Sequence, residues 1–121
     1  AMIADCLAKQ SAFFSIGTND LTQYTIGVDR ENADVSSLYN EFHLAVLRLI
    51  HHTIKEAEKA QIGLSVCGEM ASRTDSVLVL SGMGVRTLSM SPKQIGVVKE
   101  LLSHFTVEEL RAISSKSLNL L

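Results

Sequence analysis

Several features that define other protein classes are scarce or missing in this sequence. Only two cysteines occur, Cys6 and Cys67, and their wide separation predicts neither a disulfide framework nor a metal-ligand spacing. No apolar run approaches the roughly 18 residues of a membrane-spanning helix, and no signal segment is recognisable. Lysine and arginine form no block, and the formal net charge of −2 argues against a nucleic-acid partner. We expect a protein of the reducing cytoplasm that binds neither membranes nor nucleic acid.

Apolar residues, by contrast, are abundant and follow two patterns. They make up 46% of the 121 residues, which is enough for the core of one modest domain. Short apolar runs predict strands, the first two of them buried, at 12–16, 64–67 and 85–90. Apolar residues at intervals of three and four predict helices, at 2–9, 21–27, 41–60, 74–83, 93–104 and 106–114. Residues 115–121 are unassigned, and we expect them to be frayed.

Local signals predict where some of these helices begin. Asp20 is a suitable cap for the helix expected from Leu21. Ser91 followed by Pro92 matches a serine N-cap with proline in the first helical position. Residues 106–109 (TVEE) match a capping box and predict the start of a final helix.

The alternation of strands and helices predicts a parallel sheet, because helices of this length connect parallel strands by right-handed crossovers. Small or polar residues follow every predicted strand, at 17–20, 67–69 and 89–91. The carboxyl ends of parallel strands share one edge of a sheet, so we expect a common site there. Three strands cannot close a barrel and leave two unpaired edges. We therefore expect the chain to be a piece of a larger α/β protein.

Taken residue by residue, the candidate site has ordinary structural explanations. Asn19 and Asp20 are typical of a turn after a strand. Cys67 is typical of a buried structural cysteine, and Arg30 with its neighbour Asp29 is typical of an exposed loop pair. The four histidines show no metal-ligand spacing, and Cys6 is predicted to face the core.

A combination of motifs changes this interpretation. The sequence resembles the phosphoenolpyruvate-utilising enzymes from about residue 2 to residue 105, and the likeness weakens after Phe105. Within that family it is most similar to the phosphoenolpyruvate–protein phosphotransferases, the Enzyme I branch of the bacterial sugar phosphotransferase system. Tyr24 and the run 28–30 favour this branch over pyruvate phosphate dikinase and phosphoenolpyruvate synthase. The matching motifs are FFSIGTNDLTQYT at 13–25, VDR at 28–30, VCGEMA at 66–71, GMG at 82–84 and LSMS at 88–91.

The resemblance implies a (β/α)8 TIM barrel, of which residues 1–121 would hold the last three parallel strands with their helices. It also implies roles for four residues at the mouth of the barrel. Asn19 would help to hold the phosphate of phosphoenolpyruvate, and Asp20 would be a Mg²⁺ ligand. Arg30 would bind phosphoenolpyruvate, and Cys67 would be the proton donor that completes pyruvate. These residue types suit the chemistry, since Mg²⁺ prefers oxygen ligands and arginine binds phosphate with two donors.

The implied reaction transfers the phosphoryl group of phosphoenolpyruvate through an enzyme histidine to the histidine carrier protein, and it releases pyruvate. Several parts that it requires are not in this sequence: two further arginines, a second Mg²⁺ carboxylate, the phosphohistidine domain and the domain that binds the carrier. We therefore expect the chain to be inactive alone and to hold Mg²⁺ weakly. The alternatives are one half of a split enzyme, a self-associating homo-oligomeric module, or a piece of one of the two other enzymes named above.

One segment departs from the family pattern. Glu41 and Leu44 stand where the family has prolines, on either side of a loop around His43. This departure puts the shape of the loop in question, and it does not affect the four site residues.

Overall fold

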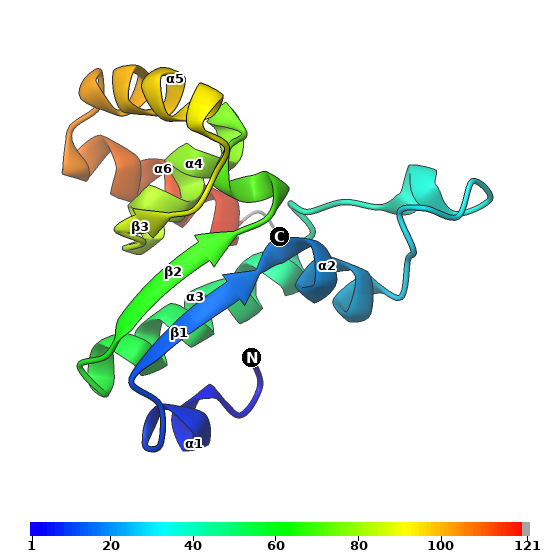
Figure 1. The fold of residues 1–121 in the computed structure, drawn as a ribbon, viewed down its shortest axis with the longest axis horizontal. Coiled ribbons are helices and arrows are strands. Elements are labelled where there is room, and N and C mark those ends of the chain that lie inside the picture. Colours follow the sequence, from blue (N-terminus) through cyan, green and yellow to red (C-terminus); the bar gives the residue numbers. More distant parts are fainter. Residues whose placement is uncertain (120–121) are drawn as a thin grey trace.

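The computed structural model describes residues 1–119, which fold into one parallel sheet with helices packed on and beside it (Figure 1). The strands lie in the order β1 (Phe13–Gly17), β2 (Gly63–Cys67) and β3 (Thr87–Leu88). The α-helices are α1 (Ala4–Ala8), α2 (Thr18–Ile26), α3 (Leu44–Lys59), α4 (Thr74–Met83), α5 (Pro92–Ser103) and α6 (Val107–Asn119). Two short 3₁₀ turns complete the order, η1 (Ser36–Leu38) and η2 (Glu69–Ala71).

The predicted α/β class with three parallel strands is confirmed. The register of β1 and β2 runs from Phe13 opposite Gly63 to Gly17 opposite Cys67, so both strands end at the same level. β3 is shorter than the expected strand at 85–90, because the backbone N–H of Val85 is still bonded to the carbonyl of Leu80 at the end of α4. The polar residues that follow β1 and β2 therefore meet at one edge of the sheet.

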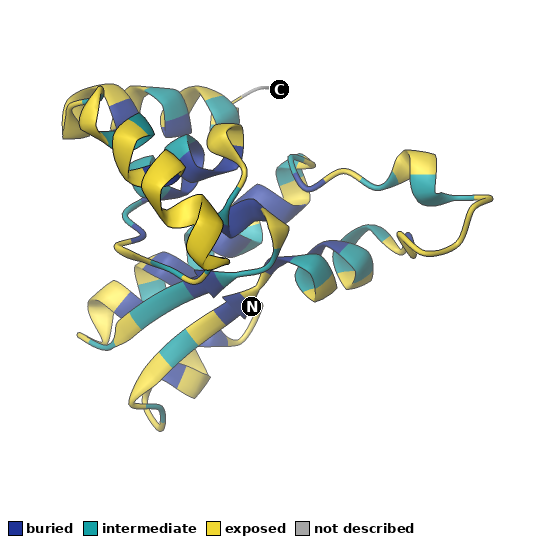
Figure 2. Ribbon diagram, turned by 45° about the horizontal axis from the view of Figure 1, so that its top comes forward, coloured by how far each residue is buried: buried dark blue, intermediate teal, exposed yellow. Residues whose placement is uncertain are grey.

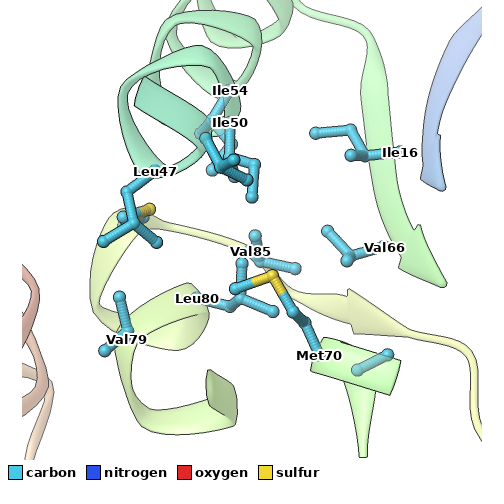
Figure 3. Packing of buried hydrophobic residues seen from close by; sticks show 12 residues of the cluster. Ile16, Leu47, Ile50, Ile54, Val66, Met70, Val79, Leu80 and Val85 are labelled. Carbon is cyan, nitrogen blue, oxygen red and sulfur yellow. The ribbon is translucent and has the colours of Figure 1, made fainter. Parts of the chain in front are cut away.

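The core lies between the sheet and α3. Ile16 and Val66 point from β1 and β2 toward Leu47, Ile50 and Ile54 of α3 (Figure 3). Residues from η2, α4 and the connection between α4 and β3 close the same cluster, namely Met70, Ala71, Val79, Leu80, Met83 and Val85. This arrangement explains the long amphipathic pattern of α3, whose buried residues recur at intervals of three and four.

β1 is not the buried strand that its apolar composition suggests. Of its five residues only Ile16 is buried, and Phe13 is 67% exposed (Figure 2). The reason is that Phe13, Ser15 and Gly17 alternate with Ile16 and so lie on the face of the sheet opposite α3, which is exposed in the described residues. Cys6 is likewise exposed rather than core-facing, because α1 buries only Ala4 and Ala8.

Several helix boundaries differ from those expected. α2 begins at Thr18 with Gly17 as its N-cap, so Asp20 lies in the first turn and is not the cap. α3 begins at Leu44 rather than 41, because Nδ1 of His43 accepts a hydrogen bond from the N–H of Ala45 (3.2 Å) and caps the helix. α6 continues to Asn119, so residues 115–119 are helical and not frayed; residues 120–121 lie outside the described part.

A long segment, residues 27–43, projects past the ends of β1 and β2 and is called the arm below (Figure 1). It leaves α2 at Gly27, whose φ of +67° is a left-handed conformation that suits glycine. Asp29 to Asp34 are all exposed, so the outer part of the arm is covered by water rather than by protein. Within residues 1–119, no helix is both long and apolar enough to cross a membrane.

Candidate functional site

The residues after β1 and β2 are bonded directly to each other. The hydroxyl of Thr18 donates to the carbonyl oxygen of Cys67 (3.1 Å), and Thr18 is completely buried. The side-chain oxygen of Asn19 accepts from the backbone N–H of Glu69 (3.1 Å). These two bonds connect the first turn of α2 to the chain that leaves β2, so the two polar segments have a fixed relative position.

Gly68 allows this close approach. Its φ of +95° and ψ of −172° lie in a region that is almost restricted to glycine. A Cβ atom there would lie 2.5 Å from Oγ1 of Thr18 and 3.1 Å from Oδ1 of Asn19. A side chain would therefore push apart the two segments that the hydrogen bonds join.

Cys67 lies at the centre of this junction and is half-buried. Its thiol is 3.6 Å from the carbonyl oxygen of Ile16, to which the S–H can donate. Cys67 thus presents a thiol at the carboxyl end of β2, next to the end of β1. This position suits proton donation, provided that the reacting carbon lies at the same edge of the sheet.

Arg30 reaches the junction from the arm. Its Nη1 is 2.6 Å from Oε1 of Glu69, the same residue whose N–H is bonded to Asn19. The two side chains are 37% and 58% exposed, so this ion pair contributes little stability. Its effect is to hold a guanidinium next to the strand ends, where that group could bind a phosphate or a carboxylate.

Asp20 occupies a different side of the same edge. It is exposed and lines a cavity of about 360 Å³ beside the free edge of β1, together with Ala4, Phe14 and Leu21. Asn19 and Arg30 are thus both bonded to Glu69, two residues after Cys67, whereas Asp20 lines the cavity beside β1. Asp20 makes no ion pair with any other residue of the described chain.

The third strand end does not join this group. Ser89 is held beside β2 by its own N–H, which donates to the carbonyl of Val66 (2.9 Å). Ser91 is the N-cap of α5, but its hydroxyl makes no capping bond within residues 1–119. Two of the three predicted strand ends thus form the candidate site.

The arm returns to the body through contacts that the sequence did not reveal. The hydroxyl of Tyr39 donates to the carbonyl oxygen of Asn19 (3.3 Å), and partial burial raises the pKa of Tyr39. Two residues further on, Oε2 of Glu41 lies 3.4 Å from Nη1 of Arg73 at the start of α4. The one available signal was that Glu41 departs from the family pattern; nothing in the sequence indicated that Arg73 is its partner.

Arg73 is shared between several groups. Its Nη2 and Nε donate to the two carboxylate oxygens of Asp75 (2.8 and 3.3 Å), and its guanidinium lies 5.8 Å from the ring centre of Phe42. Partial burial of Asp75 opposes ionisation, but hydrogen bonds from Arg73 and Ser76 outweigh it and lower the pKa of Asp75. Arg73 therefore gives its two-point contact to Asp75 and only a single long contact to Glu41.

Comparison with known proteins assigns the family. Residues 1–107 match the family described as "PEP-utilising enzyme, PEP-binding domain". The chain belongs to this family. The ends of β1 and β2 lie within the matched region, and the family agrees with the resemblance noted from the motifs.

Individual relatives are similar along almost the whole chain. Phosphoenolpyruvate-protein phosphotransferase from Borreliella burgdorferi is 44% identical over 119 residues, which are 98% of this chain and 21% of that protein. The protein of the same name from Lactococcus lactis is 42% identical over 119 residues, with the same coverage. Multiphosphoryl transfer protein from Xanthomonas campestris is 41% identical over 115 residues, 95% of this chain and 14% of that protein. The chain thus spans about a fifth or less of the length of these relatives.

Proposed function

We propose that this chain forms the last three strands of the (β/α)8 barrel of a phosphoenolpyruvate–protein phosphotransferase and carries part of its substrate site. The observation that supports the proposal is the joined pair of strand ends, where Asn19 and Arg30 are both bonded to Glu69 and Cys67 ends the neighbouring strand two residues earlier. In α/β barrels the substrate site lies at the carboxyl ends of the strands. The identity of more than 40% to phosphotransferases supports the same assignment.

In the proposed reaction, the phosphoryl group leaves the enol oxygen of phosphoenolpyruvate for a histidine in another part of the enzyme. From there it would pass to the histidine carrier protein. Arg30 and the amide of Asn19 contact the phosphate and balance its charge, which is the main requirement of phosphoryl transfer. The thiol of Cys67 then gives its proton to the methylene carbon of enolpyruvate. The enolate electrons form the ketone of pyruvate, and a thiolate remains that solvent reprotonates.

Asp20 fits one side of a Mg²⁺ site. Mg²⁺ is commonly bound by one or two carboxylates, with waters and substrate phosphates as the other ligands, and Asp20 offers one exposed carboxylate at a strand end. When bound, the ion would neutralise charge on the transferred phosphoryl group. The described residues contain no group of three His, Cys, Asp or Glu side chains that could hold a metal by themselves. We propose that further ligands come from parts of the barrel outside this chain.

We therefore expect that the chain alone does not convert phosphoenolpyruvate into pyruvate and binds it only weakly. One arginine leaves most of the charge of a trianionic substrate uncompensated, and one carboxylate holds Mg²⁺ only weakly. Calorimetric titration with phosphoenolpyruvate and Mg²⁺ checks this directly. Micromolar binding, or pyruvate release by the isolated chain, would contradict the proposal of inactivity.

A chimera tests the catalytic part of the proposal. Residues 1–119 replace the corresponding 21% of the Borreliella burgdorferi relative, and pyruvate release and phosphorylation of the histidine carrier protein are measured. We expect activity comparable to that of the parent relative. A chimera that folds but transfers no phosphoryl group would show that this chain cannot serve as the end of the barrel. The same assay, with the upstream part supplied as a separate polypeptide, tests the split-enzyme alternative.

The free edge of β1 favours one alternative, self-association. The strand leaves backbone groups unpaired on one side and exposes Phe13, and such edges readily pair with another chain. Two or more copies could pair their sheets into a homo-oligomer. Light scattering over a dilution series decides this, since a monomer at every concentration would exclude it.

A further inference from the structure

Glu41 is unusually buried for a residue at the base of an exposed arm. The residue is 3% exposed, whereas its neighbours Asn40 and His43 are exposed. Glu41 lies where the arm rejoins the body, three residues before Leu44 begins α3. A glutamate that contributed only solubility would point into water, so its burial requires another explanation.

The buried carboxylate is poorly compensated. Oε1 has no hydrogen-bond partner among the described residues, and Oε2 has only the 3.4 Å contact with Nη1 of Arg73. Arg73 is half exposed and already bonded to Asp75 through two nitrogens. An ionised carboxylate in such a place loses hydration that its partners do not replace.

The surrounding charges do not remove this imbalance. Arg73 and Asp75 face Glu41 from the start of α4, Glu69 faces it from η2, and Arg30 faces it from the arm. The two arginines favour the ionised form of Glu41 and the two carboxylates oppose it, so burial determines the direction in which the pKa shifts. Burial raises the pKa of Glu41 above its ordinary value of 4.5, although Arg73 opposes the shift.

We propose that Glu41 is a proton-linked positioning residue for the arm, which closes onto the strand ends when Glu41 takes up a proton and opens when it loses one. A group that binds protons more tightly in one conformation shifts the equilibrium toward that conformation as the pH falls. In the closed arm, Tyr39 is bonded to Asn19 and Arg30 is held at Glu69. Proton uptake by Glu41 would therefore place Arg30 at the site. Only the identity of the anion that Arg30 binds rests on the proposed function.

Hydrogen–deuterium exchange of the chain itself tests this inference without substrate. Protection of the arm is compared with protection of α3 and β2 between about pH 5 and pH 8, a range that lies above the pKa of an ordinary glutamate. Four variants are compared with the wild type at each pH, so that the intrinsic pH dependence of exchange cancels. Glu41→Gln cannot ionise, and Arg73→Gln removes the partner cation. Glu58→Gln is the control for an exposed glutamate, and Glu69→Gln removes the carboxylate that pairs with Arg30.

The proposal predicts a particular set of results. Arm protection in the wild type rises as the pH falls, and Glu41→Gln protects the arm several-fold more than the wild type at about pH 8 and removes the pH dependence. Arg73→Gln loosens the arm near neutral pH and regains protection at acid pH. Glu58→Gln keeps the pH dependence of the wild type. Glu69→Gln loosens the arm at every pH, because Arg30 loses its partner, but arm protection still rises as the pH falls.

Three outcomes would overturn it. Faster arm exchange in Glu41→Gln than in the wild type would mean that the ion pair, not the proton, closes the arm. A pH dependence that survives in Glu41→Gln would assign it to another group. Loss of protection throughout α3 and β2 in Glu41→Gln would show that the fold needs the charge. Failure of the phosphotransferase proposal would leave all these measurements unchanged, so the two can be judged separately.

Discussion

Replacing Gly68 by alanine should separate the two strand ends that make up the candidate site. The backbone at φ +95° costs a residue with a side chain about 1–3 kcal/mol. The new Cβ would also lie 2.5 Å from Oγ1 of Thr18, too close for any structure, so Thr18 must move and lose its bond to Cys67. Loss of that bond costs about 1 kcal/mol. We therefore expect Gly68→Ala to lower the free energy of unfolding by about 2–4 kcal/mol, a large part of the about 5–15 kcal/mol typical of a domain.

Gly17→Ala is the matched control, at the end of the neighbouring strand. Its φ of −85° suits any residue, and a Cβ there would have no atom within 4 Å. Urea unfolding followed by far-ultraviolet circular dichroism gives both free energies. In Gly68→Ala, the amide resonance of Glu69 should also shift, because its bond to Asn19 is disturbed. If Gly68→Ala and Gly17→Ala unfold within about 0.5 kcal/mol of each other, the tight junction does not exist as described.

Three further predictions concern the helices. A Cβ at Gly82 would collide with the carbonyl oxygen of Leu110 where α4 meets α6. Gly82→Ala should therefore lower the free energy of unfolding by about 3 kcal/mol. An unchanged free energy of unfolding in urea would refute this helix contact. Hydrogen bonds from Thr106 lower the pKa of Glu109, and the resulting stability is present above pH 4.5 and lost as the pH falls. Thr106→Ala should therefore lower the melting temperature at neutral pH and differ less from the wild type in acid, whereas an equal difference at both pH values would exclude this linkage. Burial lowers the pKa of His51 below 6.5, so the folded state binds a proton at this side chain less readily than the unfolded state and loses stability on acidification. His51→Gln should therefore lose less stability than the wild type as the pH falls below about 6.5. Identical profiles of stability against pH for the two proteins would contradict this prediction.

The parts of the fold that short-range patterns determine could be predicted from the sequence. The helix Thr74–Met83 begins and ends where the apolar pattern indicates, and Gly84 follows its last residue at φ +113°. The capping box of α6 forms as expected, since the N–H of Glu109 is bonded to Oγ1 of Thr106 (3.2 Å) and the N–H of Thr106 is bonded to the Glu109 carboxylate (2.8 Å). Both signals lie within a few residues of one another, so no distant contact was needed.

The parts that depend on distant contacts could not be predicted in the same way. The bond of Thr18 to Cys67 joins residues 49 positions apart, and the contact of Glu41 with Arg73 joins residues 32 apart. No periodicity or spacing in the sequence encodes such pairs. The prediction that Asp20 caps α2 was wrong for a related reason. Thr18 is bonded to Cys67 at the end of β2, and α2 already begins at Thr18.

Cys67 offers the most direct test of the proposed role of the two strand ends. Its thiol should supply the proton that turns enolpyruvate into pyruvate, and general acids of this kind typically contribute about 10²–10⁴-fold to the rate. The measurement is the rate of enzyme-bound pyruvate formation from phosphoenolpyruvate by the chimera and by its Cys67→Ala variant, with Cys6→Ala as the control for an exposed cysteine. The proposal predicts a loss of at least about 100-fold in Cys67→Ala and an unchanged rate in Cys6→Ala. Equal rates in the chimera and in Cys67→Ala would contradict the assignment of this site.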